Sequence, residues 1–249
     1  MQSRLDITGV LTDTVTIIQN RGAALVRSAM LPAMLLVTAN QLSIHLKLSP
    51  LIDAALVFSM PVWFTLYMVP VMRGVLINEE GIGRKWGLHW GWDETRFLLR
   101  YLIISAVPLV TFLVLLAFAL WLIPPDMRES ATEHWGMRVL GVLNMTFIFY
   151  VAVRLSMMLP AAAIGDQANP SQSWRLTRHN GWRLMGLYVL IMLVFAVLTL
   201  LLSLVLLPIL EHPAVRWIIG VINAIFGVVG VAAIATAYRK LSVNEPAKE

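Results

Sequence analysis

The chain of 249 residues is 59% hydrophobic and only 13% charged, whereas soluble domains carry about 45–50% apolar and about 25% charged residues. A soluble fold of this composition would have too little polar surface, so the composition and the mean hydropathy of +0.77 predict a polytopic membrane protein. The absence of cysteine excludes disulfides, thiolate catalysis and cysteine-ligated iron–sulfur clusters within this chain.

Six apolar segments are long enough to cross a bilayer core about 30 Å thick, which takes about 20 residues of helix. They lie near residues 24–44, 51–72, 98–123, 137–160, 184–208 and 215–238. The start of the chain, MQSRLDITGVLTDT, has no apolar core and does not resemble a cleavable signal. The sequence therefore predicts an all-α membrane protein with six transmembrane helices, in which residues 1–249 form a single integral membrane domain.

The Lys and Arg residues are distributed unequally between the two sides that these spans define. Of the 19, only four lie on one side, and these are Lys47, Arg128, Arg138 and Arg216. Because cytoplasmic segments carry the excess of positive charge, we expect both termini to be cytoplasmic. The same distribution accounts for the pI of about 9.9, so we expect contact with anionic lipid head groups and no binding of nucleic acid.

Two amphipathic or aromatic segments precede the first and third spans. In residues 4–19, apolar side chains recur at a helical spacing at Ile7, Leu11, Val15 and Ile18. In residues 86–97, Asp93 is a candidate N-cap, with Trp92 and Phe97 in the positions of a hydrophobic staple. A third such segment precedes the fifth span, and the pattern favours three helical hairpins, each preceded by a cytoplasmic interfacial helix.

The third segment, NPSQSWRLTRHNGWR, spans residues 169–183 and concentrates tryptophan and arginine. Asn169 and Pro170 predict a helix start, with Gln172 as a capping-box partner, and Asn180-Gly181 predicts its end. A helix over 170–179 is about 15 Å long, too short to cross a membrane. Membrane anchoring and an additional binding role both remain open for the candidate lipid- or partner-binding residues Arg154, Trp174, Arg175, Thr177, Arg178, Asn180, Trp182 and Arg183.

Arg154 is a charged residue inside the fourth span. An intramembrane charge marks function or pairing by default, and snorkelling to the head groups is the alternative. Candidate partners are Asp166, Glu79 and Glu80. Arg73, at the matching end of the second span, is interpreted as a residue that sets topology.

The last span is rich in small residues at near-helical spacing, which predicts close packing against another helix or another subunit. Asn144 and Asn223 are polar residues deep in apolar segments, where interhelical hydrogen bonds are expected. The candidate helix-packing residues are therefore Asn144, Gly220, Asn223, Ala224, Gly227 and Gly230. Self-association through this span is one possible partnership, and another membrane protein is the second.

The run RLSMMLPAAAIGD, followed by the segment that contains Trp174, resembles YciC-like bacterial inner-membrane proteins. It is also similar to the membrane domain that precedes some glycerophosphodiester phosphodiesterases. The matching positions are Arg154, Pro160, Ala161, Ser171, Trp174, Leu176, Thr177 and Asn180, and His179 departs from the expected glycine. The resemblance implies an integral inner-membrane protein, and the phosphodiesterase activity does not transfer because no such domain follows in this chain.

No sequence motif indicates catalysis, a cofactor or a metal site. The run GIGRKWG lacks the ending of a phosphate-binding loop, and the five histidines show no metal-ligand spacing. We therefore expect a non-enzymatic scaffold, assembly factor or accessory subunit that binds lipid or another membrane protein. The alternatives are a transporter or permease for a small anionic or lipid-like substrate and, less favoured by these residues, a lipid-active enzyme.

Overall fold

The computed structural model describes residues 4–45, 50–77, 90–122, 135–166, 169–206 and 212–243. Within these ranges the chain is α-helical apart from short turns and connecting residues. The helices are α1 (Ile7–His45), α2 (Pro50–Leu76), α3 (Trp92–Leu122), α5 (Trp135–Leu155), α6 (Met158–Ala163), α7 (Pro170–Leu176), α8 (Gly181–Val205) and α9 (Pro213–Val243).

Six helical segments are long and apolar enough to cross a membrane. They are Ile7–Ala39, Pro50–Leu76, Trp92–Val114, Gly141–Ala163, Gly181–Val205 and Ala214–Val243. The prediction of an all-α fold with six membrane-spanning helices is therefore confirmed, and the chain has the architecture of a multi-pass membrane protein.

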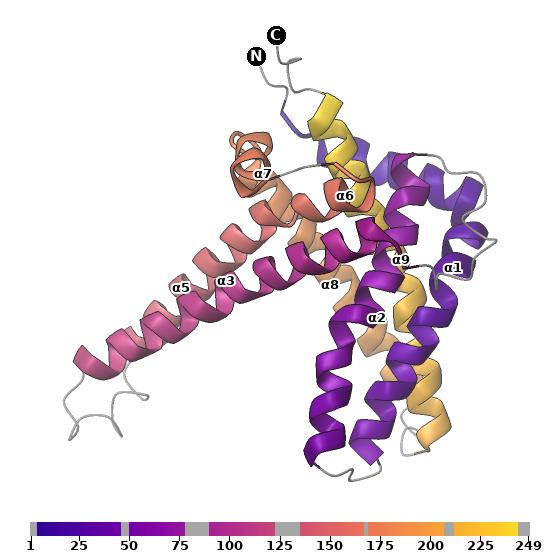
Figure 1. Ribbon diagram of the computed structural model, residues 1–249, viewed down its shortest axis with the longest axis horizontal. Coiled ribbons are helices and arrows are strands. Elements are labelled where there is room, and N and C mark those ends of the chain that lie inside the picture. Colours follow the sequence, from indigo (N-terminus) through magenta and orange to yellow (C-terminus); the bar gives the residue numbers. More distant parts are fainter. Residues whose placement is uncertain are drawn as a thin grey trace.

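The spans divide into a packed bundle and a hairpin that leans away from it (Figure 1). Helices α1, α2 and α9 pack along one another, while α8 contacts both α5 and α9. Helices α3 and α5 pair with each other and diverge from the bundle, and both termini lie at the end of the molecule where α6 and α7 are found. We call this the terminal end.

Consecutive spans do pack as the pairs α1–α2, α3–α5 and α8–α9, but α9 also closes the bundle against α1 and α2. One hydrophobic core joins α1, α2, α3, α6 and α9. A second core, nearer the termini, joins the start of α1 to α6, α7, α8 and the end of α9. The short helices α6 and α7 are thus part of the packed interior at the terminal end.

The segment 4–19 does not form a separate interfacial helix, because it runs without a break into the first span as part of α1. Its buried side chains include Leu5 and Val10, whereas Val15 is 53% exposed. Asp13 forms an ion pair of 2.9 Å with Lys240 at the end of α9. The face expected from the sequence is therefore not the buried one: Ile7, Leu11 and Ile18 are only half-buried, and the fully buried positions also include Thr14.

The second expected interfacial segment, 86–97, is only partly within the described residues, which resume at Trp90. Residues from Trp92 onward form the first turns of α3 and continue directly into the third span. Of the three expected interfacial segments, the third alone is seen as a separate helix, α7.

The fourth span is divided into α5 and α6 by a turn at Ser156 and Met157. Pro160 lacks an N–H that could bond the carbonyl of Ser156, and its ring crowds that carbonyl. The Ser156 carbonyl instead accepts from the Leu159 N–H at 3.0 Å. The break lets the fully buried α6 turn across the terminal end of the molecule.

Candidate functional site

Helix α7 begins where the sequence predicts, with Pro170 in its first turn. Asn169 occupies the N-cap position but makes no side-chain capping bond, so the expected capping interaction is absent. The helix ends at Leu176, after seven residues, and the prediction that Asn180-Gly181 ends it is wrong. Asn180 instead precedes the first residue of α8, Gly181.

Gly181 marks a close approach between α5 and α8. A Cβ atom at this position would lie 2.7 Å from the hydroxyl oxygen of Tyr150. The neighbouring Trp182 ring packs against Tyr150 with 4.9 Å between ring centroids, while 68% of Trp182 stays exposed. The glycine is therefore explained by helix packing rather than by a helix stop.

The segment 169–183 has two chemically different faces. Ser173, Leu176, Thr177 and Asn180 are almost fully buried. The exposed positions are Asn169, Pro170, Ser171, Trp174, Arg175, Arg178, His179, Trp182 and Arg183. The polar residues Ser173, Thr177 and Asn180 thus face the protein, whereas the tryptophan and arginine residues of the segment are exposed.

Arg154 joins α5 to α7 from a buried position. Only 5% of this residue is exposed, its Nε donates to Thr177 Oγ1 at 2.9 Å, and its Nη2 donates to the Trp174 carbonyl at 2.6 Å. The guanidinium also lies 3.6 Å from the centroid of the Trp174 ring, a cation–π arrangement. In return, Ser173 Oγ donates to the Arg154 carbonyl at 2.6 Å. We call these four residues the Arg154 clamp.

The partners of Arg154 differ from those expected from the sequence. No carboxylate of the described residues forms an ion pair with it, and Asp166 lies near Tyr238, whose hydroxyl donates to Asp166 Oδ2 at 3.5 Å. Glu79 and Glu80 lie outside the described residues. The charge is instead stabilised by neutral oxygen atoms and an aromatic face.

Asn180 and Arg183 hold the start of the chain. Asn180 Oδ1 accepts from the Leu5 N–H at 2.7 Å, and Arg183 Nη1 donates to the Leu5 carbonyl at 2.8 Å. Leu5 is 3% exposed, so both of its backbone groups are satisfied inside the protein. The 175 residues that separate Asn180 from Leu5 explain why no local sequence signal indicated this contact.

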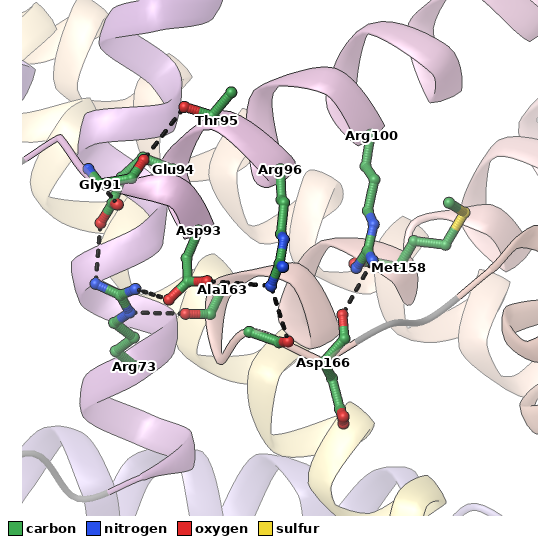
Figure 2. Close-up of polar contacts among 11 residues, drawn as sticks. Arg73, Gly91, Asp93, Glu94, Thr95, Arg96, Arg100, Met158, Ala163 and Asp166 are labelled. Atoms are coloured by element: carbon green, nitrogen blue, oxygen red, sulfur yellow. Dashed lines mark hydrogen bonds and ion pairs between the residues drawn. The ribbon is translucent and has the colours of Figure 1, made fainter.

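A second polar cluster, missed in the sequence, surrounds Arg73 at the end of α2 (Figure 2). Arg73 Nη2 pairs with Asp93 Oδ2 at 2.7 Å, and Nη1 pairs with Glu94 Oε1 at 2.9 Å. Its Nε donates to the Ala163 carbonyl at 2.7 Å. Arg73 therefore links α2, the first turn of α3 and the end of α6, which is more than a role in topology alone.

The start of α3 is built around acidic side chains. The sequence predicted that Asp93 is the N-cap of α3. Asp93 lies instead with Glu94 inside the first turn. Glu94 Oε2 accepts from the Gly91 N–H at 2.8 Å, the reciprocal half of a capping box. Carboxylates at this position are also favoured by the helix dipole, and they face Arg73.

Two further arginines of α3 reach the turn that follows α6 (Figure 2). Arg96 Nη1 donates to the Gly165 carbonyl at 3.3 Å, and Arg100 Nη2 donates to the Asp166 carbonyl at 3.0 Å. Gly165 has a φ of +83°, which favours glycine, and a Cβ there would lie 3.3 Å from Asp93 Oδ1. We call this set of contacts, together with those of Arg73, the Arg73 network.

The small residues of α9 contact helices of the same chain. A Cβ at Gly220 would lie 2.6 Å from Val37 of α1, and one at Gly227 would collide with the hydroxyl of Tyr67 of α2. Tyr67 also donates to the Ala224 carbonyl at 2.6 Å. Gly230 faces Ile191 and Phe195 of α8. Much of the small-residue surface of α9 is therefore used in packing within this chain.

The two asparagines expected in interhelical contacts behave differently. Asn223 Oδ1 accepts from Thr199 Oγ1 at 2.8 Å and so joins α9 to α8. Asn144 Oδ1 is buried without a hydrogen-bond partner within the described part of the chain. Asn144 lies on α5, among exposed apolar neighbours such as Leu143 and Met145.

Within the described ranges, no three His, Asp or Glu side chains are grouped so that they could hold a metal ion. Comparison of the chain with protein-family models, curated proteins and solved structures finds no match.

Proposed function

We propose that this multi-pass protein is a non-enzymatic component of a bacterial inner membrane, where it acts as a scaffold, assembly factor or accessory subunit. The observation that carries the proposal is the large apolar surface left on its spans. The most apolar part of α8 contains no buried residue. On α5, Val142, Leu143 and Phe147 are each at least 60% exposed. Such surfaces are suited to contact with lipid or with helices of another membrane protein.

The geometry of Arg154 favours this role over transport. A transporter would use an intramembrane charge to line a path for its substrate. Arg154 is instead buried against Trp174 and Thr177. Two cavities near the termini are lined by other side chains.

Both termini are proposed to be cytoplasmic. Supporting this orientation, many basic side chains gather at the terminal end, including those of the Arg154 clamp and the Arg73 network. The resemblance to YciC-like proteins supports the proposed location in a bacterial inner membrane. In this cysteine-free chain, an impermeant maleimide added to spheroplasts should label His212→Cys, before α9, and spare Val243→Cys, at its other end. Labelling of Val243→Cys alone would reverse the orientation.

The scaffold role is tested by site-specific photocrosslinking in native membranes. A photoreactive side chain at Met192, which is 59% exposed on α8, should form adducts with a defined set of proteins or lipids, identified by mass spectrometry. The matched control is Leu187, which is fully buried on the same helix. Adducts that are identical at both positions would argue against a specific surface. Uptake of an anion by liposomes that contain the purified protein, abolished by Arg154→Ala, would favour the transporter instead.

A further inference from the structure

Helices α1, α2 and α9 enclose a half-open cavity of about 190 Å³ at the terminal end of the bundle. Its lining comes from all three helices and consists of Thr16, Ile17, Asn20, Arg21, Gly74, Val75 and Arg239. Because the bundle helices are held together by the core below this point, the cavity is formed by the main packing unit of the fold.

The charge in this cavity is entirely positive. Arg21 and Arg239 both line it, and no aspartate or glutamate does. Within the described residues, neither guanidinium forms a hydrogen bond or an ion pair. This distinguishes them from Arg73, which is bound to two carboxylates, and from Lys240, which is bound to Asp13.

A second cavity shares Arg239 with the first but differs from it in the charge of its lining residues. It measures about 380 Å³ and is lined in part by Arg4, Asp6, Arg239 and Lys240. Asp6 contributes a negative charge there, so its lining is of mixed sign. Arg239 lines both cavities, but only the smaller one combines two arginines with no acidic residue.

We infer that the smaller cavity binds the phosphate group of an anionic lipid head group through Arg21 and Arg239. Guanidinium groups bind phosphate oxygens through pairs of parallel N–H donors, and the amide of Asn20 provides a further donor at the same surface. The volume is below the about 300–1,000 Å³ of sites for drug-sized ligands, which suits a head group.

The position of the cavity along the membrane-spanning helices favours a lipid as the source of the phosphate. Arg21 lies in the first half of α1 and Arg239 in the last turns of α9, so both lie toward the terminal ends of their spans, and basic residues at span ends are suited to contact with head groups. The inference depends on the proposed lipid contact in a membrane but not on the scaffold role. Free phosphate has the same chemistry, and the experiment separates the two sources.

The experiment uses the full-length protein purified in a mild, uncharged detergent. Native mass spectrometry follows binding of short-chain phosphatidic acid, with short-chain diacylglycerol as the probe that lacks phosphate. Isothermal titration calorimetry follows inorganic phosphate in parallel. Arg21→Gln and Arg239→Gln are compared with Arg27→Gln, which removes the same charge from an exposed position on α1 that does not line the cavity.

Phosphatidic acid is expected to bind the parent chain with an apparent Kd that weakens about tenfold or more in Arg21→Gln and in Arg239→Gln, as expected for the loss of charged hydrogen bonds. Arg27→Gln is expected to stay within about twofold of the parent. Binding of phosphatidic acid without inorganic phosphate identifies a lipid site. Binding of both, with the same dependence on the two arginines, identifies a site for phosphate itself.

The inference is overturned if neither probe binds, if diacylglycerol binds as well as phosphatidic acid, or if Arg27→Gln weakens binding as much as the cavity variants. A Gln variant that does not purify in folded form is replaced by Arg21→Lys or Arg239→Lys, which keeps the charge but loses the planar fork. Each Lys form should weaken binding severalfold, and unchanged binding in both would also overturn the site. Because the assay uses purified protein, its result is independent of the photocrosslinking at α8.

Discussion

Arg73 and Arg154 lie near the ends of α2 and α5, at the same end of the molecule, yet the protein accommodates them in opposite ways. Arg73 meets two carboxylates and one backbone carbonyl. Arg154 is more deeply buried and meets a hydroxyl, a carbonyl and an indole ring. A charge near the end of a helix can thus be stabilised by a counter-ion or by a set of oriented neutral groups.

The two arrangements differ in the charge of the groups that lose their partner when the arginine is removed. Loss of Arg73 would leave the Glu94 carboxylate without this counter-ion, whereas loss of Arg154 would leave neutral groups. Thr177 Oγ1, for example, also donates to the Ser173 carbonyl at 2.9 Å. Removing one partner of a buried ion pair is costly mainly because the other charge is left uncompensated. The difference between the two arginines is therefore measurable as a difference in stability.

The largest effect is expected for Arg73→Ala. Glu94 is only 4% exposed, so its uncompensated charge should lower the free energy of unfolding by about 3–5 kcal/mol. Asp93, with a side chain 33% exposed, is screened by solvent and should add little. Denaturant unfolding in detergent micelles, followed by circular dichroism, provides the measurement.

The control for Arg73→Ala is Arg96→Ala, in the same network. Arg96 lies 3.6 Å from Asp93 with a side chain 34% exposed, so this loss should cost less than about 1 kcal/mol. Adding Glu94→Gln to Arg73→Ala should restore part of the stability, because it removes the uncompensated charge. Equal losses in Arg73→Ala and Arg96→Ala would show that the ion pairs of Arg73 are not the stabilising element.

The sequence predicted the spans because the length of an apolar helix is set by the thickness of the bilayer. It also predicted the start of α7 at Pro170, a local signal of helix initiation. It did not predict that residues 4–19 would continue into α1, because an amphipathic face looks the same whether it meets lipid or protein. Hydropathy alone does not distinguish these environments.

The polar clusters were only partly predictable. Arg154 was identified as an exceptional charge, but its acceptors could not be inferred, because one is a backbone carbonyl and the other a threonine hydroxyl. Arg73 pairs with residues of the next span, about 20 positions away, and helical periodicity gives no register between two spans. Local patterns report on single helices, whereas these contacts depend on how α2, α3 and α6, and α5 and α7, meet.

A smaller effect is expected for Arg154→Ala, about 2–3 kcal/mol, since charged hydrogen bonds and the contact with Trp174 are lost but no charge is left behind. Arg154→Lys should cost nearly as much, because an ammonium cannot bond Thr177 and the Trp174 carbonyl while lying flat on the ring. The same unfolding assay applies, with near-ultraviolet circular dichroism to report on the indole environment.

The control for Arg154 is Arg178, an exposed arginine of the same segment. Arg178→Lys and Arg178→Ala should each change stability by less than about 0.5 kcal/mol. An Arg154→Lys form with the stability and spectrum of the parent would mean that a point charge is sufficient there. Arg154 would then stabilise the protein through its positive charge alone, and its specific hydrogen bonds would not distinguish it from Arg73.

The smallest expected effect is the difference in stability between alanine variants of Asn180 and Asn169, which lie at the two ends of the α7 segment. Asn180→Ala removes the acceptor for the buried Leu5 N–H and should cost about 1–2 kcal/mol, because that N–H is left unsatisfied. Asn169 is exposed and makes no capping bond, so Asn169→Ala should stay within about 0.5 kcal/mol of the parent. Hydrogen exchange should quicken at Leu5 and the first turn of α1 in Asn180→Ala only. Faster exchange in α7 of Asn169→Ala, with the N-terminus unchanged in both variants, would instead make Asn169 the stabilising residue and leave the start of the chain anchored by Arg183 alone.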